Sequence, residues 1–436
     1  MFFNKKNIVP LLLFFILPFL DCVLISAAED HDQQTNSASE TQGLNLFDCY
    51  RLALKQSETL SIEQELIKES DGRFRQALSG ILPQVTFSTS QEWQDRGGSS
   101  NASSEIPESK FVFSQPLFSG FKEFAAMAAS RAERRQREAQ KIRAQQLLFK
   151  DVSDAFYFLL AYQEDLEALK VIQTVLTDRL EELNKRVHLG RSRKSEVAGA
   201  EVRLRRLEAE IELVNSQKEV ARQLMEFLTG QEVVHIEDSA DIQTDLSDEN
   251  DYLAKAVERA DVRAAKEAWM MAQKEVLVAY AGYWPAVSLD GNYYTKRTGS
   301  SKNIDWDITL KVEIPIFKGT ETSGAVKVEK AQLAQAKLQL DLAKRKAEQD
   351  IKNSYVSLKT AWKRKEALAK AVTAAEDNYR YQKEDYNNNL VNNLDVLDSL
   401  QELQDTQRDF IAAHNEFNRD YWNFQVSLGA IDRDTF

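Results

Sequence analysis

The sequence predicts a mainly α-helical protein with a membrane β-barrel, built from a duplicated unit of two β-strands and a long antiparallel helical hairpin. Three observations support this fold class. The 436-residue chain repeats itself with a period of about 200 residues. Four segments of about 9–11 residues have the alternating or β-rich composition of strands. Long stretches of helical pattern contain neither glycine nor proline, including the 104 residues between Gly324 and Gly429.

The duplication is visible in matching phrases that keep one spacing. FSQPLFSG at 113–120 matches VEIPIFKG at 312–319, and Gly230 matches Gly429, both pairs 199 residues apart. Upstream, ALSGILPQV at 77–85 matches AYAGYWPAV at 279–287 at a spacing of 202. The three-residue difference lies in a Gly/Ser-rich loop, where a change of length costs little.

Residues 1–28 are predicted to be a secretory signal peptide, followed by a flexible N-terminal segment at 29–43. Two lysines precede an apolar stretch at 8–20, and small residues end the segment at a cleavage site. A membrane anchor fits less well, because two prolines and an aspartate interrupt a short apolar run. Lipidation at Cys22 also fits less well, because Leu20 and Asp21 are poor neighbours for it.

The first structural repeat is predicted at 44–230. Its strands lie at about 84–94 and 110–118, and its helical hairpin at about 120–230. A linker at 231–250 then leads to the second repeat.

The second structural repeat is predicted at 251–430, before a C-terminal tail at 431–436. Its strands lie at about 286–296 and 305–315, and its hairpin at about 320–428. The last strand alternates most clearly, with Trp306, Ile308, Leu310, Val312 and Ile314 on one face and Asp305, Asp307, Thr309, Lys311 and Glu313 on the other.

The strands have the length that crosses a bilayer when tilted, and aromatic side chains near their ends are typical of a membrane interface. An open sheet in lipid leaves edge groups unpaired at several kcal/mol each, so only closed barrels are stable there. Known barrels begin at about eight strands. We therefore predict that several chains share one barrel: two chains would supply 8 strands, three 12 and four 16.

The second helix of each hairpin has the spacing of a coiled-coil seam, alternating four and three residues. In the first repeat the seam is Val197, Ala200, Leu204, Leu207, Ile211, Val214, Lys218, Ala221, Met225 and Leu228. In the second it is Val396, Leu400, Leu403, Gln407, Phe410, His414, Phe417, Tyr421, Phe424 and Leu428. Hairpins of about 100 Å do not pack into an ordinary globule. Arranged around the barrel axis, they would form a tube.

Composition and motifs exclude several other functions. The net charge of −12 is unsuited to nucleic acid. No phosphate loop, nucleophile elbow or dinucleotide fingerprint is present, and His31, His188, His235 and His414 lack metal-ligand spacing. Cys49 is the only cysteine beyond the signal peptide. We predict no enzymatic activity, no cofactor and no metal site.

The duplicated layout resembles the TolC family of outer-membrane efflux proteins, also called outer-membrane factors. The resemblance covers residues 44–432 and includes Pro83 and Pro285 before strands, the phrases QPLFSG and IPIFKG, and LDVLDSL after the second turn. It implies a homotrimer with a 12-stranded outer-membrane barrel and a 12-helix periplasmic coiled-coil tunnel. It further implies an exit duct of a tripartite efflux or type I secretion system, passively conducting substrates from an inner-membrane pump.

The partners implied are outer-membrane lipid, a periplasmic adaptor (membrane fusion) protein and an inner-membrane transporter of RND, ABC or MFS type, with no nucleic acid. The alternative that the residues leave open is a periplasmic coiled-coil adaptor or structural envelope protein. The substrate, the particular pump and its energy source do not follow from the sequence.

The hairpin tips are predicted at Gly190 and Asn389. The asparagine-rich segment 387–393 aligns with 188–194 at the 199-residue spacing, and Gly190 suits a left-handed turn. Asparagine is the commonest residue after glycine in that conformation. A disordered low-complexity segment is the competing interpretation, although helical pattern resumes on both sides.

Asp395 and Asp398 lie in the first turns after the second tip. The simplest explanation is the helix dipole, which favours acidic residues there. In TolC-like channels, aspartates of the phrase DVLD line the closed end of the tunnel, so the resemblance implies a periplasmic gate formed by Asp395, Asp398 and Tyr386. Carboxylate rings favour cations. This chain has Val391 where well-known members have a latching arginine, so the resemblance does not say how the tip is held shut.

Overall fold

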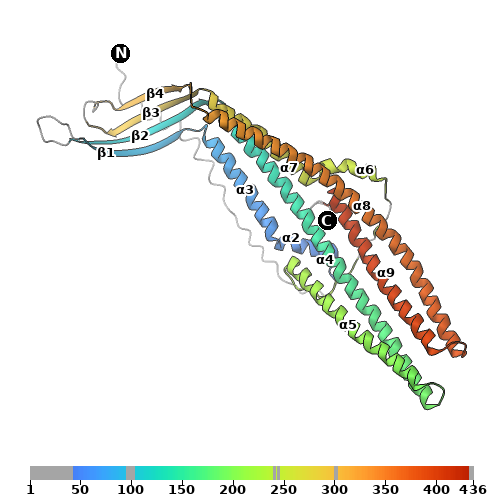
Figure 1. The fold of residues 1–436 in the computed structure, drawn as a ribbon. Coiled ribbons are helices and arrows are strands. Elements are labelled where there is room, and N and C mark those ends of the chain that lie inside the picture. The colour runs from blue at the N-terminus through green and yellow to red at the C-terminus, as the bar shows by residue number, and fades with distance from the viewer. Residues whose placement is uncertain (1–42, 95–103, 239–241, 243–245, 299–302, 432–436) are drawn as a thin grey trace. The chain divides into compact units, whose positions relative to one another are not determined.

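The computed structural model describes residues 43–94, 104–238, 242, 246–298 and 303–431 (Figure 1). They belong to one compact unit, Gly43–Phe436. The predicted signal peptide at 1–28 lies outside the described residues. So do the predicted flexible segment, apart from its last residue, and residues 432–436 of the predicted tail.

Four antiparallel strands form one sheet in the order β1-β2-β3-β4 (Figure 1). β1 spans Gln84–Gln94, β2 Ser104–Ser119, β3 Ala286–Lys296 and β4 Trp306–Glu313. β2 belongs to the first repeat and β3 to the second. Their pairing therefore joins the two copies of the unit into a single sheet.

Two strands differ from the sequence prediction. β2 begins at Ser104 rather than at about 110, because residues 104–109 pair with the end of β1. The pattern hid this extension, since it contains Pro107, which cannot donate a ladder hydrogen bond. β4 spans Trp306–Glu313 rather than 305–315, because its partner β3 begins opposite Glu313.

The strand register separates apolar from polar side chains. One face of the sheet has Val85 and Phe87 of β1, Phe111 and Phe113 of β2, Val287, Leu289 and Tyr293 of β3, and Trp306, Ile308, Leu310 and Val312 of β4. The opposite face has Ser114 of β2, Ser288, Asp290 and Asn292 of β3, and Asp307, Thr309 and Lys311 of β4. In the single chain the large apolar side chains of β4 are more than half exposed. Such a face requires an apolar surrounding.

Each repeat contains a 67-residue helix followed by a 36-residue helix (Figure 1). In the first repeat these are α4, Lys122–His188, and α5, Lys194–Thr229. In the second they are α8, Glu321–Asn387, and α9, Asn393–Leu428. Every bound recurs 199 residues later, so the duplication predicted from the sequence is confirmed in three dimensions.

Shorter helices precede each pair of strands. α2, Leu46–Gln56, and α3, Glu58–Ser79, lead into β1. α6, Glu249–Leu253, a 3-10 helix at Ala254–Glu258, and α7, Ala260–Tyr280, lead through a second 3-10 helix, Ala281–Tyr283, into β3. Across the described residues, no helix combines the length and the apolar composition that crossing a membrane requires.

The predicted seams form the cores of the hairpins. α5 buries Ala200, Leu204, Leu207, Ile211, Val214, Ala221 and Met225 of its seam, largely against α4. α9 buries Val396, Leu400, Leu403, Phe417, Phe424 and Leu428 of its seam. The four-three spacing therefore identified the packed face of both helices.

The predicted linker at 231–250 contributes to the core as well as connecting the repeats. Leu44 and Ile236 form a parallel β-bridge, in which the Leu44 amide donates to the His235 carbonyl at 3.0 Å. Val233 and Ile236 are each 1% exposed and pack with α2 and α4. The beginning of this segment is a structural part of the fold, because its apolar side chains are buried.

Candidate functional site

The two hairpin tips have the same backbone geometry. Each turn has five residues, 189–193 and 388–392. Gly190 has φ +69° and Asn389 has φ +58°, the left-handed conformation that closes a helix. The following amide donates five residues back in both turns, from Arg191 to Arg186 at 2.8 Å and from Leu390 to Asp385 at 2.9 Å. The structure thus places Gly190 and Asn389 at equivalent positions.

A capping box starts α9. The Asn392 side chain accepts hydrogen bonds from the amides of Leu394, at 2.7 Å, and Asp395, at 3.2 Å. The Asp395 carboxylate in turn accepts from the Asn392 amide at 3.0 Å. These bonds satisfy amides that otherwise lack partners at a helix start. Asp395 therefore has a local structural role, as the helix-dipole interpretation expected.

Asp398 makes a contact between the two hairpins. Its side chain is 60% exposed and forms an ion pair with Arg203 of α5. The same guanidinium donates to the Leu397 carbonyl at 2.7 Å. Arg203 therefore holds the start of α9 against α5 through one charged and one neutral acceptor. The sequence reasoning did not identify Arg203, since it lies beside the buried seam and has no motif of its own.

Tyr386 lies in a second contact between the hairpins. Its side chain is buried, and the guanidinium groups of Arg179 and Arg186 lie 4.0 and 4.7 Å from its ring centroid. Arg179 is itself buried and donates to the Asn393 side chain at 2.9 Å. Glu182 accepts from both arginines at 2.7 Å. The last residues of α8 and the first of α9 are thus bound to one arginine pair on α4.

The arginines that hold the second tip come from the first hairpin. The turn of the second hairpin, 388–392, contains Val391 and no basic residue. Arg179, Arg186 and Arg203 supply the cations instead, from α4 and α5. A cation stacked on an aromatic ring contributes up to about 2 kcal/mol when both are desolvated. The contacts therefore form a defined cross-hairpin latch, which we call the arginine latch: Arg179, Arg186 and Arg203 with Tyr386, Asn393 and Asp398.

The same interface continues further from the tips. Arg408 of α9 donates to both oxygens of Asp165 of α4, at 2.7 and 2.9 Å, and pairs with Glu210 of α5. Trp422 of α9 donates to the Tyr157 hydroxyl at 3.1 Å and packs edge-on against Phe149 of α4. Apolar side chains cross between the hairpins as well, because Leu397 and Leu400 of α9 belong to the core formed with α4 and α5. The interface between the hairpins therefore combines directional polar contacts with apolar packing.

Three of the four histidines, His188, His235 and His414, lie among the described residues. Among the described residues, no three His, Cys, Asp or Glu side chains lie together in a way that could hold a metal ion. His414 lies on α9, and its Nε2 atom is 3.5 Å from Nδ2 of the Asn418 side chain. Burial lowers the pKa of His414, and neighbouring Lys365 lowers it further. His31 lies outside the described residues.

A sheet with one apolar and one polar face, joined to two equal helical hairpins, defines the class of outer-membrane channel subunits. The chain belongs to the outer membrane efflux protein family, whose model matches residues 49–231 and 254–430. It is 20% identical over 366 residues to outer membrane protein TolC of Vibrio cholerae serotype O1, covering 81% of this chain and 83% of TolC.

Solved structures share the fold. The outer membrane protein VceC from Vibrio cholerae superimposes with a TM-score of 0.77 and 21% identity, covering 88% of this chain and 96% of VceC. The CmeC outer membrane channel of Campylobacter jejuni does so with a TM-score of 0.74 and 18% identity, covering 91% of this chain and 90% of CmeC. These similarities confirm the predicted fold class.

Family membership confirms the predicted function and location. The chain is an outer-membrane exit duct of efflux systems, with its helical part in the periplasm. The family consists of channels that work with adaptors and inner-membrane pumps. The alternative of a periplasmic adaptor is set aside, because the family match includes both repeats.

Proposed function

We propose that three copies of this chain close one 12-stranded barrel and one 12-helix tunnel, through which substrates pass passively from an inner-membrane pump. This is supported by the two edges of the sheet and the two ends of the row of hairpin helices, which have no further strand or hairpin helix beside them within the described chain. β1 and β4 are the outer strands of the described sheet. Among the four hairpin helices, α8 packs on α9, α9 on α4 and α4 on α5, so α5 and α8 are the ends of this row, while α7 packs on α4 and α8 and α3 packs on α4.

α5 has a second seam that faces away from its hairpin. Spacings of four and three also connect Val202, Arg206, Ala209, Leu213, Ser216, Val220, Gln223 and Phe227, and all eight are exposed in the single chain. Phe227 is 78% and Val220 is 64% exposed. A helix with two such seams is typical of a bundle in which each helix has two neighbours.

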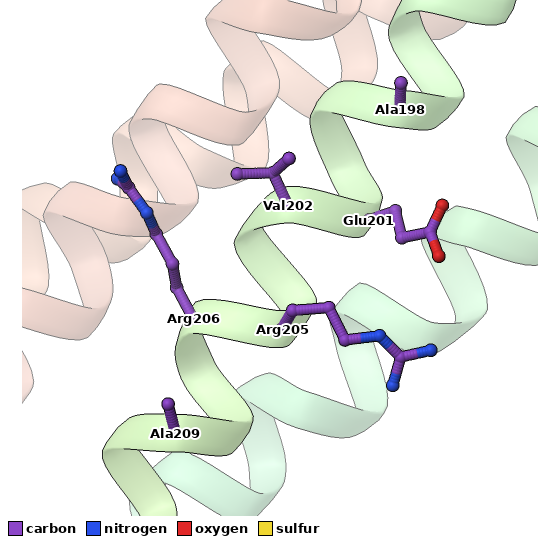
Figure 2. A pocket seen from close by; sticks show the side chains of 6 residues that line it. All are labelled: Ala198, Glu201, Val202, Arg205, Arg206 and Ala209. Carbon is purple, nitrogen blue, oxygen red and sulfur yellow. The ribbon is translucent and has the colours of Figure 1, made fainter.

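Figure 2 shows the part of this seam nearest the tip. A shallow groove follows α5 there and is lined by Ala198, Glu201, Val202, Arg205, Arg206 and Ala209. The alanines leave room for close approach of a neighbouring helix, while the charged side chains lie around them. This surface therefore suits a helix packed alongside α5.

The exposed edge of α8 is complementary in charge. Lys352, Val356, Lys359 and Lys363 follow the same spacing and are exposed. Arg364, beside these residues on α8, forms an ion pair with Glu416 of α9. Glu416 is equivalent to residue 217 of α5 at the 199-residue spacing, so this part of α8 corresponds in height to the part of α5 around residue 217. Acidic side chains Glu212, Glu219 and Glu226 lie along that part of α5. The natural neighbour of α5 is therefore α8 of a second copy.

The gate that we propose for this duct is formed by Asp395, Asp398 and Tyr386. Threefold symmetry would bring six carboxylates to one constriction, where they would favour cations. Tyr386 would act through the arginine latch, because its ring lies on Arg179 and Arg186. Separation of α8 and α9 from α4 and α5 would then release the start of α9 and widen the opening.

For the duct's partners we propose a periplasmic adaptor and a transporter of RND, ABC or MFS type. The family match covers both repeats and does not distinguish a tripartite efflux system from a type I secretion system, so both remain within the proposal. In either case the energy comes from the pump, and this chain supplies the passage.

The test of the trimer is the native mass of the protein, extracted from outer membranes in mild detergent, by light scattering. We expect the mass of three chains. Glu219→Lys/Glu226→Lys should lower the temperature at which the oligomer dissociates, and adding Lys359→Glu/Lys363→Glu should restore it. The matched control Glu167→Lys/Asp178→Lys changes exposed acids on α4, which has helical neighbours on both sides within the chain, and should have no effect. A stable monomeric wild-type protein would contradict the proposal.

A further inference from the structure

Glu164 of α4 is an acidic side chain in the contact between the two hairpins that has no cation paired with it. The next residue, Asp165, also meets α9 and accepts hydrogen bonds there from Arg408. Glu164 instead accepts from the neutral side chain of Asn415 at 2.7 Å and, among the described residues, forms no ion pair. A partly buried carboxylate without a cation is costly to keep charged. The contact therefore favours the neutral, protonated acid.

Asn415 has an unused hydrogen-bond acceptor in the same contact. The residue is 2% exposed. Its Nδ2 group donates to Glu164 at 2.7 Å and to the Ile411 carbonyl at 3.0 Å. Its Oδ1 atom is buried and accepts no hydrogen bond from any residue that the structure describes. A buried acceptor without a donor costs free energy. An ionised carboxylate has no hydrogen to give this atom, whereas a protonated carboxyl group has one.

The electrostatic surroundings act in the same direction. Burial raises the pKa of Glu164, the hydrogen bond from Asn415 opposes this, and the charge of Asp238, in the segment between the repeats, raises the pKa again. Burial lowers the pKa values of His414 on α9 and Lys365 on α8, and Asp238 lies close enough to both to favour their charged forms. The net direction for Glu164 is upward, which extends its protonated form to higher pH.

The cations of the neighbouring helices do not neutralise Glu164. Arg408 of α9 is held by Asp165 at 2.7 and 2.9 Å. Lys365 of α8 lies over an aromatic ring of α9, 4.6 Å from its centroid. Within the described chain, neither of them, nor Lys218 on the seam of α5, lies within ion-pair distance of Glu164. A proton is the remaining way to neutralise this carboxylate in place.

We propose that the contact of Glu164 with Asn415 binds a proton when the periplasm is acidic, and that the bound proton tightens the packing of the two hairpins. The protonated carboxyl group would donate to Asn415 Oδ1, so the buried acceptor would gain its missing hydrogen bond. In separated hairpins Glu164 would be solvated and would have the ordinary acidity of glutamate. Proton binding therefore favours the packed hairpins as the pH falls towards the ordinary pKa of glutamate, with no further gain below it.

This inference rests on the proposed function, in which separation of the hairpins opens the duct. Acid would then favour the closed duct through a contact far along the sequence from the proposed gate. The carboxylates of Asp395 and Asp398 are a second place at which acid could act. They are the same in every variant of Glu164, so a comparison of these variants at one pH isolates the contact.

The test replaces Glu164 with glutamine, whose amide offers the donor and the acceptor of the protonated acid. The melting temperature of the full-length protein is measured in mild detergent at pH 7.5 and at pH 5 by tryptophan fluorescence. At pH 7.5 we expect Glu164→Gln to melt about 2 °C above the wild type. At pH 5 the difference should fall to less than half, because the wild type then carries the proton itself.

Two controls separate the contact from the loss of a negative charge. Glu167→Gln makes the same change at an exposed position one turn further along α4, and should not raise the melting temperature. Asn415→Leu removes the amide, and Glu164→Gln should then bring no gain. Infrared difference spectra between the two pH values should show a protonated carboxyl group in the wild type that Glu164→Gln lacks.

The consequence for the duct is measured in planar bilayers at pH 7.5. There we expect the open fraction of Glu164→Gln to be about threefold lower than that of the wild type, and the two proteins should approach each other at pH 5.

The inference would be overturned if Glu164→Gln melted no higher than the wild type at pH 7.5, if the difference were the same at both pH values, or if the infrared signal did not depend on Glu164. The expected melting difference with equal open fractions would confirm the proton contact and contradict the proposed opening by separation of the hairpins.

Discussion

The two hairpins have one backbone design and two surface chemistries. Both have helices of 67 and 36 residues and a left-handed residue at the same place in the turn. The first tip is basic and starts α5 without a side-chain cap, whereas the second is neutral to acidic and starts α9 with a capping box. Because duplication supplied the same geometry twice, the differences identify what each tip does beyond folding.

The arginine latch depends on this difference. Arg179, Arg186 and Arg203 lie in the first repeat, and their partners Tyr386, Asn393 and Asp398 lie in the second. Two identical hairpins would place like charges against each other, or would leave the arginines and their aromatic, amide and carboxylate partners unpaired. Divergence of the copies therefore gave the interface its charged and cation–aromatic contacts, beside the apolar packing of Leu397 and Leu400.

The largest effect, a loss of unfolding free energy, is expected for substitutions at the residues that start α3 and α7. Ser57 caps α3 with its hydroxyl, whereas the equivalent Arg259, 202 residues later, is 2% exposed and pairs with Asp261 and Asp350. Arg259→Met would remove the buried donor to the Ala347 and Ser427 carbonyls together with both ion pairs, and should cost about 1–3 kcal/mol of unfolding free energy. Ser57→Ala should cost about 0.5–2 kcal/mol.

Both variants can be compared by urea unfolding in detergent, followed by tryptophan fluorescence. An equal or smaller loss in Arg259→Met than in Ser57→Ala would show that the buried arginine does not fasten α7 to α8 and α9.

The next effect concerns the latch. Tyr386→Leu removes the ring beneath two guanidinium groups, and we expect the open fraction in planar bilayers to rise about tenfold, the equivalent of about 1.4 kcal/mol. Tyr386→Phe keeps the ring and should behave almost as the wild type. Arg51→Met, which alters an exposed arginine paired within α2 to Asp48, serves as the control. Equal opening by the leucine and phenylalanine variants would instead assign the effect to the hydroxyl.

A smaller effect should distinguish the two aspartates. Asp398→Ala frees Arg203 from its ion pair, so it should lower cation selectivity and loosen the closed state together. Asp395→Asn removes charge and weakens the capping box, so it should lower selectivity with little opening. Reversal potentials and single-channel recordings separate these outcomes. Asp405→Ala/Asp409→Ala, further along α9, controls for charge, and selectivity that changes equally there would contradict a local carboxylate ring.

The last prediction concerns the reactivity of the Cys49 thiol, for which we expect the smallest functional effect. Burial raises the pKa of its thiol to about 12, and the nearby Asp48 adds to the shift. The native thiol should therefore stay protonated at pH 8 and react with a maleimide only on unfolding, because the thiolate is the nucleophile. Thiol labelling across a urea titration should follow the unfolding curve. Labelling before unfolding would mean that α2 opens independently of the rest.

The fold could be predicted far better than the latch. Repeat spacing, four-three periodicity and turn residues are local signals, so helix bounds, seams and tips followed from short windows such as 387–393. The extension of β2 to Ser104 did not, since it depends on pairing with β1 around Pro107. Arg203 and Arg179 gave no signal either, because their partners lie 195 and 214 residues away.

The sequence by itself determined the duplication, the two strands and the helical hairpin of each unit, the packed seams and the hairpin tips, because these depend on neighbours within a few turns. Only the tertiary structure decided which helices lie beside α5 and α9, which sheet edges are open, and which arginines of the first hairpin bind Tyr386 and Asp398. Such contacts are set by the packing of distant segments, and no periodicity in one helix records the side chains of another.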